Sequence, residues 1–493
     1  MKNTPFLSKS KYVDGLKCLK LLWYEYNRRE EIPETDDGTT ALFEQGKAVG
    51  KLAHKLFPGG ILLERDAEPE KQAEKSLKAA SLGKPLFEAG FIFNRLYALA
   101  DILLPVSGGV WDLIEVKSAT SVKEVYCRDA AFQKHVYEGA GLRIRKCYIM
   151  YVNNQYVRQG DIDPERLLTK EDITRQVDAI IPSVEANAQQ MLQAIREHTC
   201  PDIKIGQHCN SPYPCPLESV CRDFLPRDGN VLCLVSPGKR PYELIEKGIY
   251  SISDIPGDGG LNEKQKIQVE CHKTGQPHIN KGGIKQFLNT LKYPLYFLDF
   301  ETIAPAIPAY DNSRPYETIP FQYSLHIVRK EGMEPEHHSY LAPGNKDPRP
   351  EILKRLKQLL GNSGSVIAYN AAFEKTAMRK AVEIYTEYRE WLKLIEERVI
   401  DLLTPFRSFL YYHPCQEGSA SIKNVLPAMT NSGYSYMEIA EGGTASIEYS
   451  RITFGEDVPE EERQRILSAL EKYCALDTKG MIEIVDELRK LCR

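Results

Sequence analysis

The sequence predicts an α/β protein with two domains and a small helical connector. Its 493 residues exceed what one ordinary core can organise, and 42% hydrophobic with 27% charged residues is typical of a globular chain. Between residues 291 and 493, strand-like apolar segments alternate with helical patterns, as in an α/β sheet. Residues 1–225 also contain both kinds of segment. We therefore expect domains at 1–225 and 291–493, with the connector at 226–290.

The expected elements of the first domain are helices, strands and a closing loop rich in proline and cysteine. The helices are expected near Leu16–Asn27, Leu42–Lys55, Phe132–Gly139 and Ile173–His198. The strands are expected at Gly90–Pro105, Trp111–Ser118 and 146–152, and the loop at 200–221. In the connector, PYELIEKGIYSISDIP favours either a spacer or a helix-hairpin-helix-like element that binds the DNA backbone.

The second domain is expected to begin with two strands and to end with two helices. Its strands are predicted at 295–301, 321–329, 365–369 and 399–403. Its helices are predicted at 350–360, 371–385, 459–476 and 479–490.

The net charge of −4 does not indicate a polyanionic partner, although a basic groove can exist on an acidic protein. The first residues lack an apolar segment of signal-peptide length, and no segment approaches the roughly 18 apolar residues of a membrane span. We therefore expect a cytoplasmic protein with no membrane contact. In that reducing location, twelve cysteines indicate metal binding or use in the core more than a disulfide framework.

Acidic residues interrupt the buried strand predicted in YFLDFET (296–302). Asp299 and Glu301 project to the same face of that strand, where two unpaired carboxylates are costly to bury. Glu374 lies in the first helical turn of SVIAYNAAFEKTAM, and Tyr473 and Asp477 share one helical face in EKYCALDTKGM. Four converging carboxylates would suit two magnesium or manganese ions, which can support phosphodiester hydrolysis. The alternative is a solvated edge-strand pair and a surface helix residue.

These three motifs, DFE, YNAAFE and YCALD, resemble those of the DEDD 3′-to-5′ exonucleases, which have an RNase H-like fold. The YxxxD form of the last motif and SIKNVLPAM (421–429) are also similar to that family. The resemblance implies that Asp299, Glu301, Glu374 and Asp477 hold two metal ions and that Tyr473 orients the attacking water. One departure is Glu374, where the family has aspartate; Asp401 in VIDLL is a possible substitute ligand.

A second acidic motif lies in the first domain, in WDLIEVKSA (111–119). Glu115 and Lys117 share one face of a predicted strand, and Asp101 ends the preceding strand. An acid pair that binds magnesium beside a lysine that polarises water is a compact hydrolytic site. The fragment alone is equally typical of a surface Glu–Lys pair with a separate aspartate.

With His54 upstream and Gln133 and Tyr137 downstream, this set resembles the RecB-like branch of the PD-(D/E)xK nucleases, which have a restriction-endonuclease-like fold. The resemblance implies that His54, Asp101, Glu115 and the carbonyl of Val116 bind the metal. It implies that Lys117 is catalytic and that Gln133 and Tyr137 contact the substrate or support the site.

Four cysteines complete the second resemblance. Cys209, Cys215 and Cys221 are spaced C-x5-C-x5-C in a proline-rich loop, and Cys18 lies far upstream. RecB-like nucleases of the CRISPR-associated and AddAB types use one early and three late cysteines to bind a 4Fe-4S cluster. The late spacing here is wider than their C-x2-C-x5-C, so a structural zinc is the alternative, with His208 or Cys200 replacing one thiolate.

Together the two resemblances imply a metal-dependent nuclease with two active sites that hydrolyses DNA, with single strands or free ends as the expected substrate. An exonuclease acting on RNA is the first alternative. The second is a nucleic-acid-binding module in which one of the two sites has lost its activity.

Overall fold

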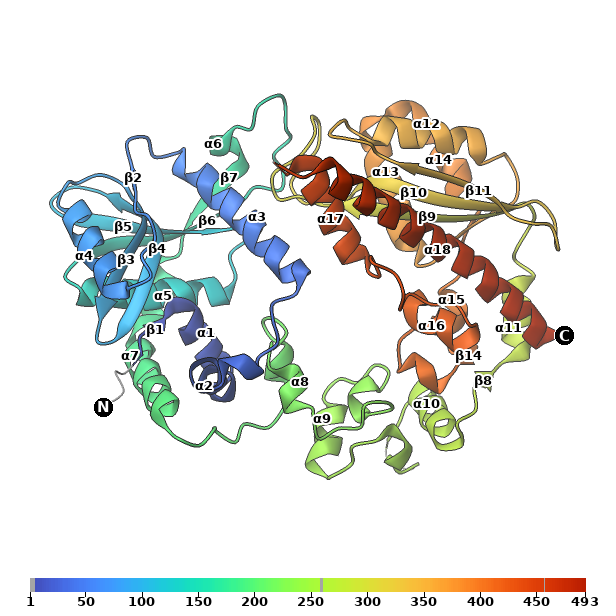
Figure 1. The fold of residues 1–493 in the computed structure, drawn as a ribbon, viewed down its shortest axis with the longest axis horizontal. Helices are drawn as coiled ribbons and strands as arrows, with labels where there is room; N and C mark the ends of the chain where they lie inside the picture. Colours follow the sequence, from blue (N-terminus) through green and yellow to red (C-terminus); the bar gives the residue numbers. More distant parts are fainter. Residues whose placement is uncertain (1–4, 258–259, 456) are drawn as a thin grey trace. The chain divides into compact units, whose positions relative to one another are not determined.

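The computed structural model describes residues 5–257, 260–455 and 457–493, and confirms the α/β class (Figure 1). The chain divides into two compact units. The first comprises Met1–Asp223 with Pro305–Tyr316, and the second comprises Phe224–Ala304 with Glu317–Arg493. The segment expected as a connector therefore belongs to the second unit. The sequence did not indicate that Pro305–Tyr316, which follows the predicted DFE strand, belongs to the first.

The first unit contains a seven-stranded sheet with the order β2-β3-β4-β5-β6-β7, and β1 pairs with β4 outside this path. The strands are β1 (Leu7–Ser8), β2 (Ile61–Leu62), β3 (Leu86–Phe93), β4 (Leu96–Pro105), β5 (Val110–Lys117), β6 (Arg143–Val152) and β7 (Leu168–Asp172). The prediction of one strand over Gly90–Pro105 was wrong: β3 and β4 form a hairpin. Asn94 and Arg95 make its turn, with positive φ angles of 46° and 69°.

The α-helices of this unit are α1 (Lys9–Lys17), α2 (Leu19–Asn27), α3 (Asp37–His54), α4 (Pro69–Ala80), α5 (Glu124–Gly139), α6 (Pro164–Leu167), α7 (Thr174–Arg196) and α8 (Glu218–Cys221). Short 3₁₀ helices lie at Arg29–Glu31 and Gln207–Asn210. The single helix predicted at Leu16–Asn27 was wrong, because Cys18 is extended (φ −161°, ψ 116°) and separates α1 from α2.

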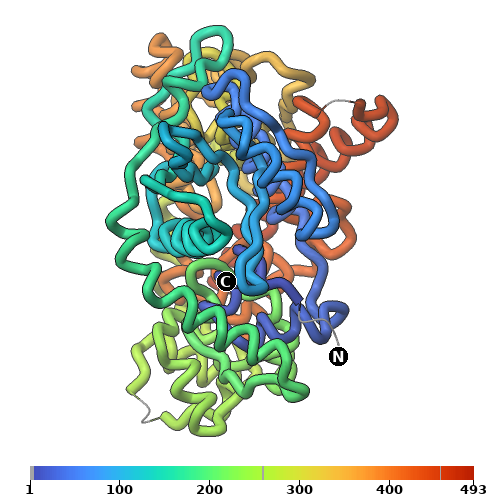
Figure 2. Tube along the Cα trace, turned by 90° about the vertical axis from the view of Figure 1, so that its left-hand side faces the viewer, coloured from blue at the N-terminus to red at the C-terminus, as the bar shows by residue number. Residues whose placement is uncertain are grey.

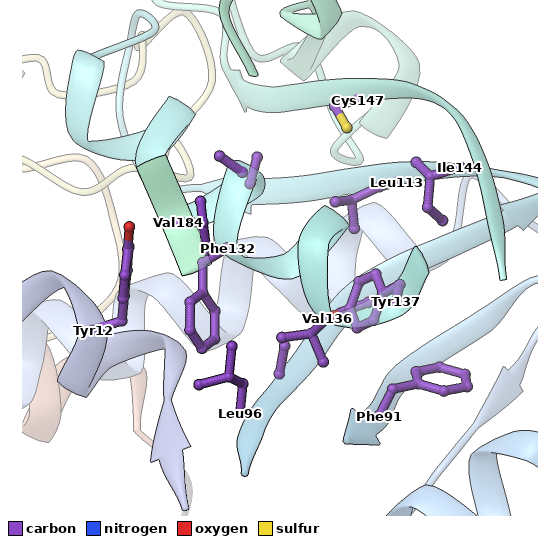
Figure 3. Packing of buried hydrophobic residues seen from close by; sticks show 14 of the residues in the cluster. Tyr12, Phe91, Leu96, Leu113, Phe132, Val136, Tyr137, Ile144, Cys147 and Val184 are labelled. Carbon is purple, nitrogen blue, oxygen red and sulfur yellow. The ribbon is translucent and has the colours of Figure 1, made fainter. Parts of the chain in front are cut away.

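The core of the first unit lies between its sheet and the helices α1, α5 and α7. Figure 3 shows Phe132, Val136 and Tyr137 of α5 together with Leu96 of β4 and Phe91 of β3; each is at most 1% exposed. In the tube trace of Figure 2, α5 and α7 lie side by side. This packing holds α5, which carries Gln133 and Tyr137, against the strand that carries Asp101.

The segment Pro305–Tyr316 packs within the first unit through backbone and side-chain hydrogen bonds. The N–H of Ala306 donates to Gln45 Oε1 (2.9 Å), and the Tyr316 hydroxyl donates to the carbonyl of Ser118 (2.6 Å). Ala306 is fully buried in an apolar cluster with Val49 of α3 and Ile102 of β4. The segment is therefore part of the core of this unit.

The second unit contains a five-stranded sheet with the order β11-β10-β9-β12-β13. The strands are β9 (Leu295–Ile303), β10 (Ile319–Val328), β11 (Glu336–Leu341), β12 (Ser365–Ala368) and β13 (Val399–Asp401); β8 (His278–Ile279) and β14 (Tyr411–Tyr412) form a separate pair. The central strand β9 is antiparallel to β10 and parallel to β12.

The α-helices of the second unit are α9 (Arg240–Glu246), α10 (Glu263–Thr274), α11 (Lys281–Leu288), α12 (Arg349–Leu359), α13 (Ala371–Ile384), α14 (Arg389–Glu396), α15 (Thr404–Arg407), α16 (Ile422–Met429), α17 (Gly442–Phe454) and α18 (Glu460–Cys492). Short 3₁₀ helices lie at Val231–Cys233, Ile252–Asp254, Thr386–Tyr388 and Pro414–Gln416. The two helices predicted after residue 459 were wrong, because α18 is continuous over 33 residues. Gly480 lies inside it, and a Cβ there would stand 2.8 Å from Leu426 of α16, so the glycine permits close helix packing.

None of the helices in the described ranges has the length and apolar content needed to span a membrane.

Candidate functional site

The strand β9 places two carboxylates on one face of its sheet. Asp299 pairs across the ladder with Ser324 of β10, and Glu301 pairs with Gln322. The alternate residues Tyr296, Leu298 and Phe300 enter the apolar cluster with α12 and α13. The alternation predicted from YFLDFET thus separates an apolar face from an acidic one.

Glu374 approaches from the end of the parallel neighbour β12. The chain turns at Asn370, which adopts a left-handed conformation (φ 69°), and α13 then begins with Glu374 in its first turn, 3% exposed. Asp401 holds this turn: its Oδ1 accepts the N–H groups of Asn370 and Leu403, both at 3.0 Å. Asp401 does not line the cavity described below, so the structure gives it a role in the turn and leaves Glu374 at the site.

The helix α18 contributes Tyr473 and Asp477, 3% and 6% exposed, and buried polar contacts fix it to the sheet. Gln322 donates to the carbonyl of Leu470 (2.9 Å). The hydroxyl of Thr478, next to Asp477, lies 2.7 Å from Ser324 Oγ and 2.8 Å from His326 Nδ1. These hydrogen bonds fix the position of α18 along β10 and therefore the position of Asp477.

The predicted acidic residues of the second unit line one cavity of about 420 Å³. Its walls come from β9, from α13 and the turn before it, and from α16, α17 and α18. They comprise Asp299, Phe300, Glu301, Thr302, Ala304, Tyr369, Asn370, Phe373, Glu374, Ile422, Gly442, Ser446, Tyr473, Asp477 and Met481. Asp299 and Asp477, 178 positions apart in sequence, therefore line the same cavity.

Gly442, at the start of α17, was not identified from the sequence. A Cβ at this position would lie 3.6 Å from Glu301 Oε2 and 3.9 Å from the Tyr473 hydroxyl. The absence of a side chain at residue 442 thus keeps open the space in front of both groups. The pair Gly442–Gly443 is the signal that could have indicated a close backbone approach.

A tighter group of ligand atoms includes two of the residues that line this cavity. Within the described residues, one group of at least three Asp, Glu, His or Cys ligand atoms lies within 4.8 Å of one another, namely Asp299, Glu301 and Cys474. The Cys474 thiol donates to Asp299 Oδ2 (3.5 Å). Glu374 Oε2 is buried and has no hydrogen-bond partner among the residues that the structure describes. A buried carboxylate oxygen with an unmet acceptor is the feature that a cation would satisfy.

Burial perturbs all four carboxyl groups, and repulsion by neighbouring acids adds to it at Asp299, Glu301 and Glu374. Burial and the neighbouring acids hold the pKa values of Asp299 and Glu374 well above their ordinary range. Burial, with the charge of Asp477, raises the pKa of Glu301 to about 8. Burial also raises the pKa of Asp477 to about 6, against the opposing effects of Tyr434, Lys423 and Tyr473.

Two further residues, Lys423 and Tyr434, act on this cluster without having been predicted as site residues. The Tyr434 hydroxyl donates to Asp477 Oδ1. The Lys423 ammonium lies 5.5 Å from the centre of the Tyr473 ring and 5.9 Å from that of Tyr434. Its charge lowers the pKa of both Glu301 and Asp477, so it partly compensates the acidic cluster.

We expect the metal-free protein to lose stability as the pH rises through this acidic cluster. The folded-state pKa values of Glu301 (about 8) and Asp477 (about 6) lie above their unfolded values, so protonation favours the fold. This contribution is complete below about pH 4 and is lost as pH rises through about 6 and then about 8. Thermal unfolding in EDTA across this range measures it. Glu301→Gln should flatten the upper part of the curve, and parallel curves for both proteins would contradict the prediction.

The candidate site of the first unit lies where two strands separate. β5 pairs with β4 from Ile114 opposite Ile102 to Trp111 opposite Pro105. Beyond that point Asp101 and Glu115 face the opening, and the Asp101 Oδ2 atom accepts the N–H of Val116 (2.7 Å). β1 then occupies the edge of β4 beside Leu96 and Tyr97.

Glu115 is the centre of this site and is 1% exposed. Its Oε1 accepts Lys117 Nζ (2.8 Å) and Lys9 Nζ (2.6 Å), and its Oε2 accepts Gln133 Nε2 (2.6 Å). Lys117 also pairs with Asp129 (2.7 Å). Lys9 and Asp129 were missed, because nothing in their local sequence indicates contact with the predicted site.

The charges in this site shift its carboxyl groups in opposite directions. Burial, with the charge of Glu115, raises the pKa of Asp101 to about 7. Burial alone would also raise the pKa of Glu115, but Lys117 and Lys9 together hold it below its usual range. The buried Tyr137 hydroxyl and Gln133 Oε1 have no hydrogen-bond partner within the described chain.

His54, the last residue of α3, stacks on Phe87 with ring centroids 4.1 Å apart. Burial lowers the pKa of His54. At Asp299, one ligand atom from each of three residues lies within 4.8 Å of the others. Among the residues described, His54, Asp101 and Glu115 do not form such a group. The structure thus brings Asp101, Glu115, Val116, Lys117 and Gln133 together and leaves His54 further out.

The four predicted cysteine ligands line a common cavity. Cys18 lies at the start of α2, and Cys209, Cys215 and Cys221 come from the loop 200–221, with His208 and Lys20 also on the wall. The thiols are free, and burial, with the other three sulfurs close by, raises the pKa of Cys221 to about 11. His208 Nε2 lies 3.7 Å from Cys209 Sγ, whereas Cys200 does not line the cavity.

Comparisons with known proteins reach part of this chain. The profile of a protein family described as a domain of unknown function, DUF2779, matches residues 296–421. This span contains Asp299, Glu301 and Glu374 and ends before Tyr473. The "Uncharacterized protein MG366" of Mycoplasma genitalium is 28% identical over 221 residues, 41% of this chain and 33% of that protein. The "Uncharacterized protein MG366 homolog" of Mycoplasma pneumoniae is 26% identical over 222 residues, with the same shares. The chain therefore matches about a third of the length of these curated relatives.

Proposed function

We propose that this protein is a metal-dependent nuclease that hydrolyses DNA phosphodiester bonds at two separate sites. The observation that carries the proposal is the cavity of the second unit. Four carboxylates from β9, α13 and α18 line it together with Tyr473. Its volume of about 420 Å³ is within the range of small-ligand pockets, enough to admit part of a nucleotide.

The residues of this cavity fit magnesium or manganese. Asp299, Glu301, Glu374 and Asp477 offer oxygen ligands, the type that these cations prefer. Within the described ranges, Glu374 Oε2 has no hydrogen-bond partner. When bound, the ions would activate a water and stabilise the charge on the leaving oxygen. Tyr473, held beside Asp477, would orient that water with its hydroxyl. Lys423 places a positive charge near the same oxygens, where it favours an anionic substrate.

The fold order supports an RNase H-like assignment for this unit. A central strand carries the first acid pair, its parallel neighbour leads to a helix that carries the third acid, and the last helix carries the fourth. This is the arrangement that the DEDD resemblance implies. Glu374 takes the place of the family aspartate, and its longer side chain still lines the cavity.

The first unit would supply a RecB-like PD-(D/E)xK site. Asp101 and Glu115 would hold a cation with the carbonyl of Val116, and Lys117 would polarise the scissile phosphate. The unsatisfied Tyr137 hydroxyl and Gln133 Oε1 are buried donor and acceptor groups that substrate or water would complete. His54 would need to move inward to join this set.

The cysteine cavity favours an iron–sulfur cluster over a single zinc ion. Sulfur atoms around one tetrahedral zinc are about 3.8 Å apart, given a Zn–S distance of about 2.3 Å. Among the residues that the structure describes, no three of the four thiols lie within 4.8 Å of one another. A 4Fe-4S core is larger and would fill this wider spacing, with Cys18, Cys209, Cys215 and Cys221 as its ligands.

A glycine-to-leucine pair tests the cavity itself. Gly442→Leu would fill the space in front of Glu301 and Tyr473, so we expect DNA hydrolysis by the second unit to fall on the order of 10²-fold. Gly443→Leu is the matched control, since a Cβ there would meet nothing within 4 Å. Equal activities of the two variants, measured by release of nucleotides from labelled DNA, would show that the cavity is not the reaction site.

Degradation assays with matched DNA and RNA strands test the proposed function. We expect the wild-type protein to shorten single-stranded DNA with Mg²⁺ or Mn²⁺ and not with EDTA. Asp299→Ala and Glu115→Ala, prepared separately, should each remove one component of that activity. Faster degradation of RNA would favour the alternative substrate. Activity untouched by one of the two changes would mark the corresponding unit as a binding module.

A further inference from the structure

An additional lysine enters the candidate site of the first unit from the start of the chain. Leu7 and Ser8 form β1 and pair with Leu96 and Tyr97 of β4, the strand that also carries Asp101. Ser8 also caps the N-terminus of α1, with its hydroxyl accepting the N–H of Lys11 (3.5 Å). Lys9, the first residue of α1, is thereby held beside the opening between β4 and β5.

The ammonium of Lys9 occupies an acceptor position on Glu115. Lys9 Nζ lies 2.6 Å from Glu115 Oε1, the oxygen that Lys117 also contacts, while Gln133 bonds the other oxygen. The Lys9 side chain is 23% exposed, against 2% for that of Glu115. Lys117 divides its charge between Glu115 and Asp129. Among the described ion pairs, Lys9 is directed to Glu115 alone.

The two candidate sites therefore differ in how their acidic charge is balanced. In the second unit a carboxylate oxygen of Glu374 is buried and has no hydrogen-bond partner in the described part of the chain. In the first, both oxygens of Glu115 already have donors from three side chains. A divalent cation that binds Glu115 needs a lone pair of the same oxygens, and it would meet the positive charge of Lys9 there.

We propose that Lys9 is a tethered counter-ion of this site, which a divalent cation must displace from Glu115 before the site is loaded. Without metal, Lys9 adds to the stabilisation of a buried carboxylate whose other cation, Lys117, is shared with Asp129. Once displaced, its ammonium remains at the opening on a helix anchored to β4, where it would pair with a phosphate of the substrate. The inference rests on the proposed nuclease function of the first unit.

Manganese binding measured by titration calorimetry tests this inference. The background protein carries Asp299→Asn and Asp477→Asn, so that the first unit supplies the measured site. In that background we expect Lys9→Met to bind Mn²⁺ about tenfold more tightly, since the competing charge is gone. Lys11→Met is the matched control: Lys11 lies on the same helix and pairs with Glu25, so its loss should leave the affinity unchanged.

Thermal unfolding separates this role from a purely structural one. In EDTA, Lys9→Met should unfold at a lower temperature than the background, and Mn²⁺ should raise that temperature more in the variant. If Lys9→Met does not fold, Lys9→Gln replaces it in this test, because glutamine keeps a hydrogen-bond donor but carries no charge. Lys9→Gln should also bind Mn²⁺ more tightly than the background protein. Unchanged, weaker or absent Mn²⁺ binding in the folded variant would overturn the inference. Loss of wild-type DNA hydrolysis in Glu115→Ala would still support the proposed function in that case.

Discussion

Asp299→Asn is expected to lower DNA hydrolysis by the second unit on the order of 10³-fold while making the metal-free protein more stable. Both effects have one cause, the concentration of negative charge around Asp299. Its pKa is held well above the usual range by burial and by Asp477, Glu374 and Glu301. The amide keeps the shape of the side chain but removes its charge, so it relieves repulsion and weakens cation binding.

Two measurements separate this outcome from general damage to the fold. The thermal midpoint in EDTA above about pH 7 should rise, and the gain on adding Mn²⁺ should shrink relative to wild type. Asp486→Asn is a suitable control, because Asp486 is exposed on α18 and pairs with Arg489. A variant that is less stable and equally active would show that Asp299 is a structural residue.

The second large effect is expected for Cys18→Ser, which should release the metal from the cysteine cavity. Cys18 joins the start of α2 to a loop about 190 residues later, so ligation would close a very long loop. Because metal binding at such a site contributes directly to folding, we expect a loss of about 3 kcal/mol or more in the unfolding free energy. The metal content is measured by metal analysis and by absorption spectra of protein purified under nitrogen.

The same variant should impair the first unit more than the second. Burial, with Tyr213 of the cysteine loop, raises the pKa of Tyr126 to about 12, and the Tyr126 ring lies 5.1 Å from Lys117 Nζ, so the loop adjoins the proposed catalytic lysine. Cys200→Ser is the matched control: Cys200 lies in the same loop but not on the cavity wall, and its variant should keep the metal. Equal metal content in wild type and Cys18→Ser would refute the ligand assignment.

The sequence was sufficient for features that depend on local periodicity. Asp299 and Glu301 could be placed on one strand face because neighbouring apolar residues alternate with them. Glu374 could be placed because it lies in the first turn of a helix that follows a strand. Asp477 could be placed because it shares one helical face with Tyr473. Even so, helix ends were misplaced, as at the extended Cys18, which separates α1 from α2, and at residues 477–478, where α18 continues without a break.

The missing site residues depend on tertiary contacts that no local pattern records. Lys9 reaches Glu115 only because β1 pairs with the first residues of β4, along a part of β4 that β5 does not pair with. Lys423 and Tyr434 act on Asp477 through the packing of α16 and the loop after it. His54 was expected as a metal ligand with Asp101 and Glu115, and the sequence did not indicate that its ring stacks on Phe87.

The segment Pro305–Tyr316 has a practical consequence for dissecting the molecule. Because it leaves β9 only a few residues after Glu301 and completes the core around Val49 and Ile102, no single cut of the polypeptide separates two intact halves. A fragment ending near residue 225 would expose the apolar core residues that Ala306 covers. A fragment starting near residue 290 would carry Pro305–Tyr316 with its apolar side chains exposed. An isolated N-terminal half would thus need an added copy of this short peptide to regain its native interior, whereas an isolated C-terminal half would need the peptide removed or replaced by a polar linker.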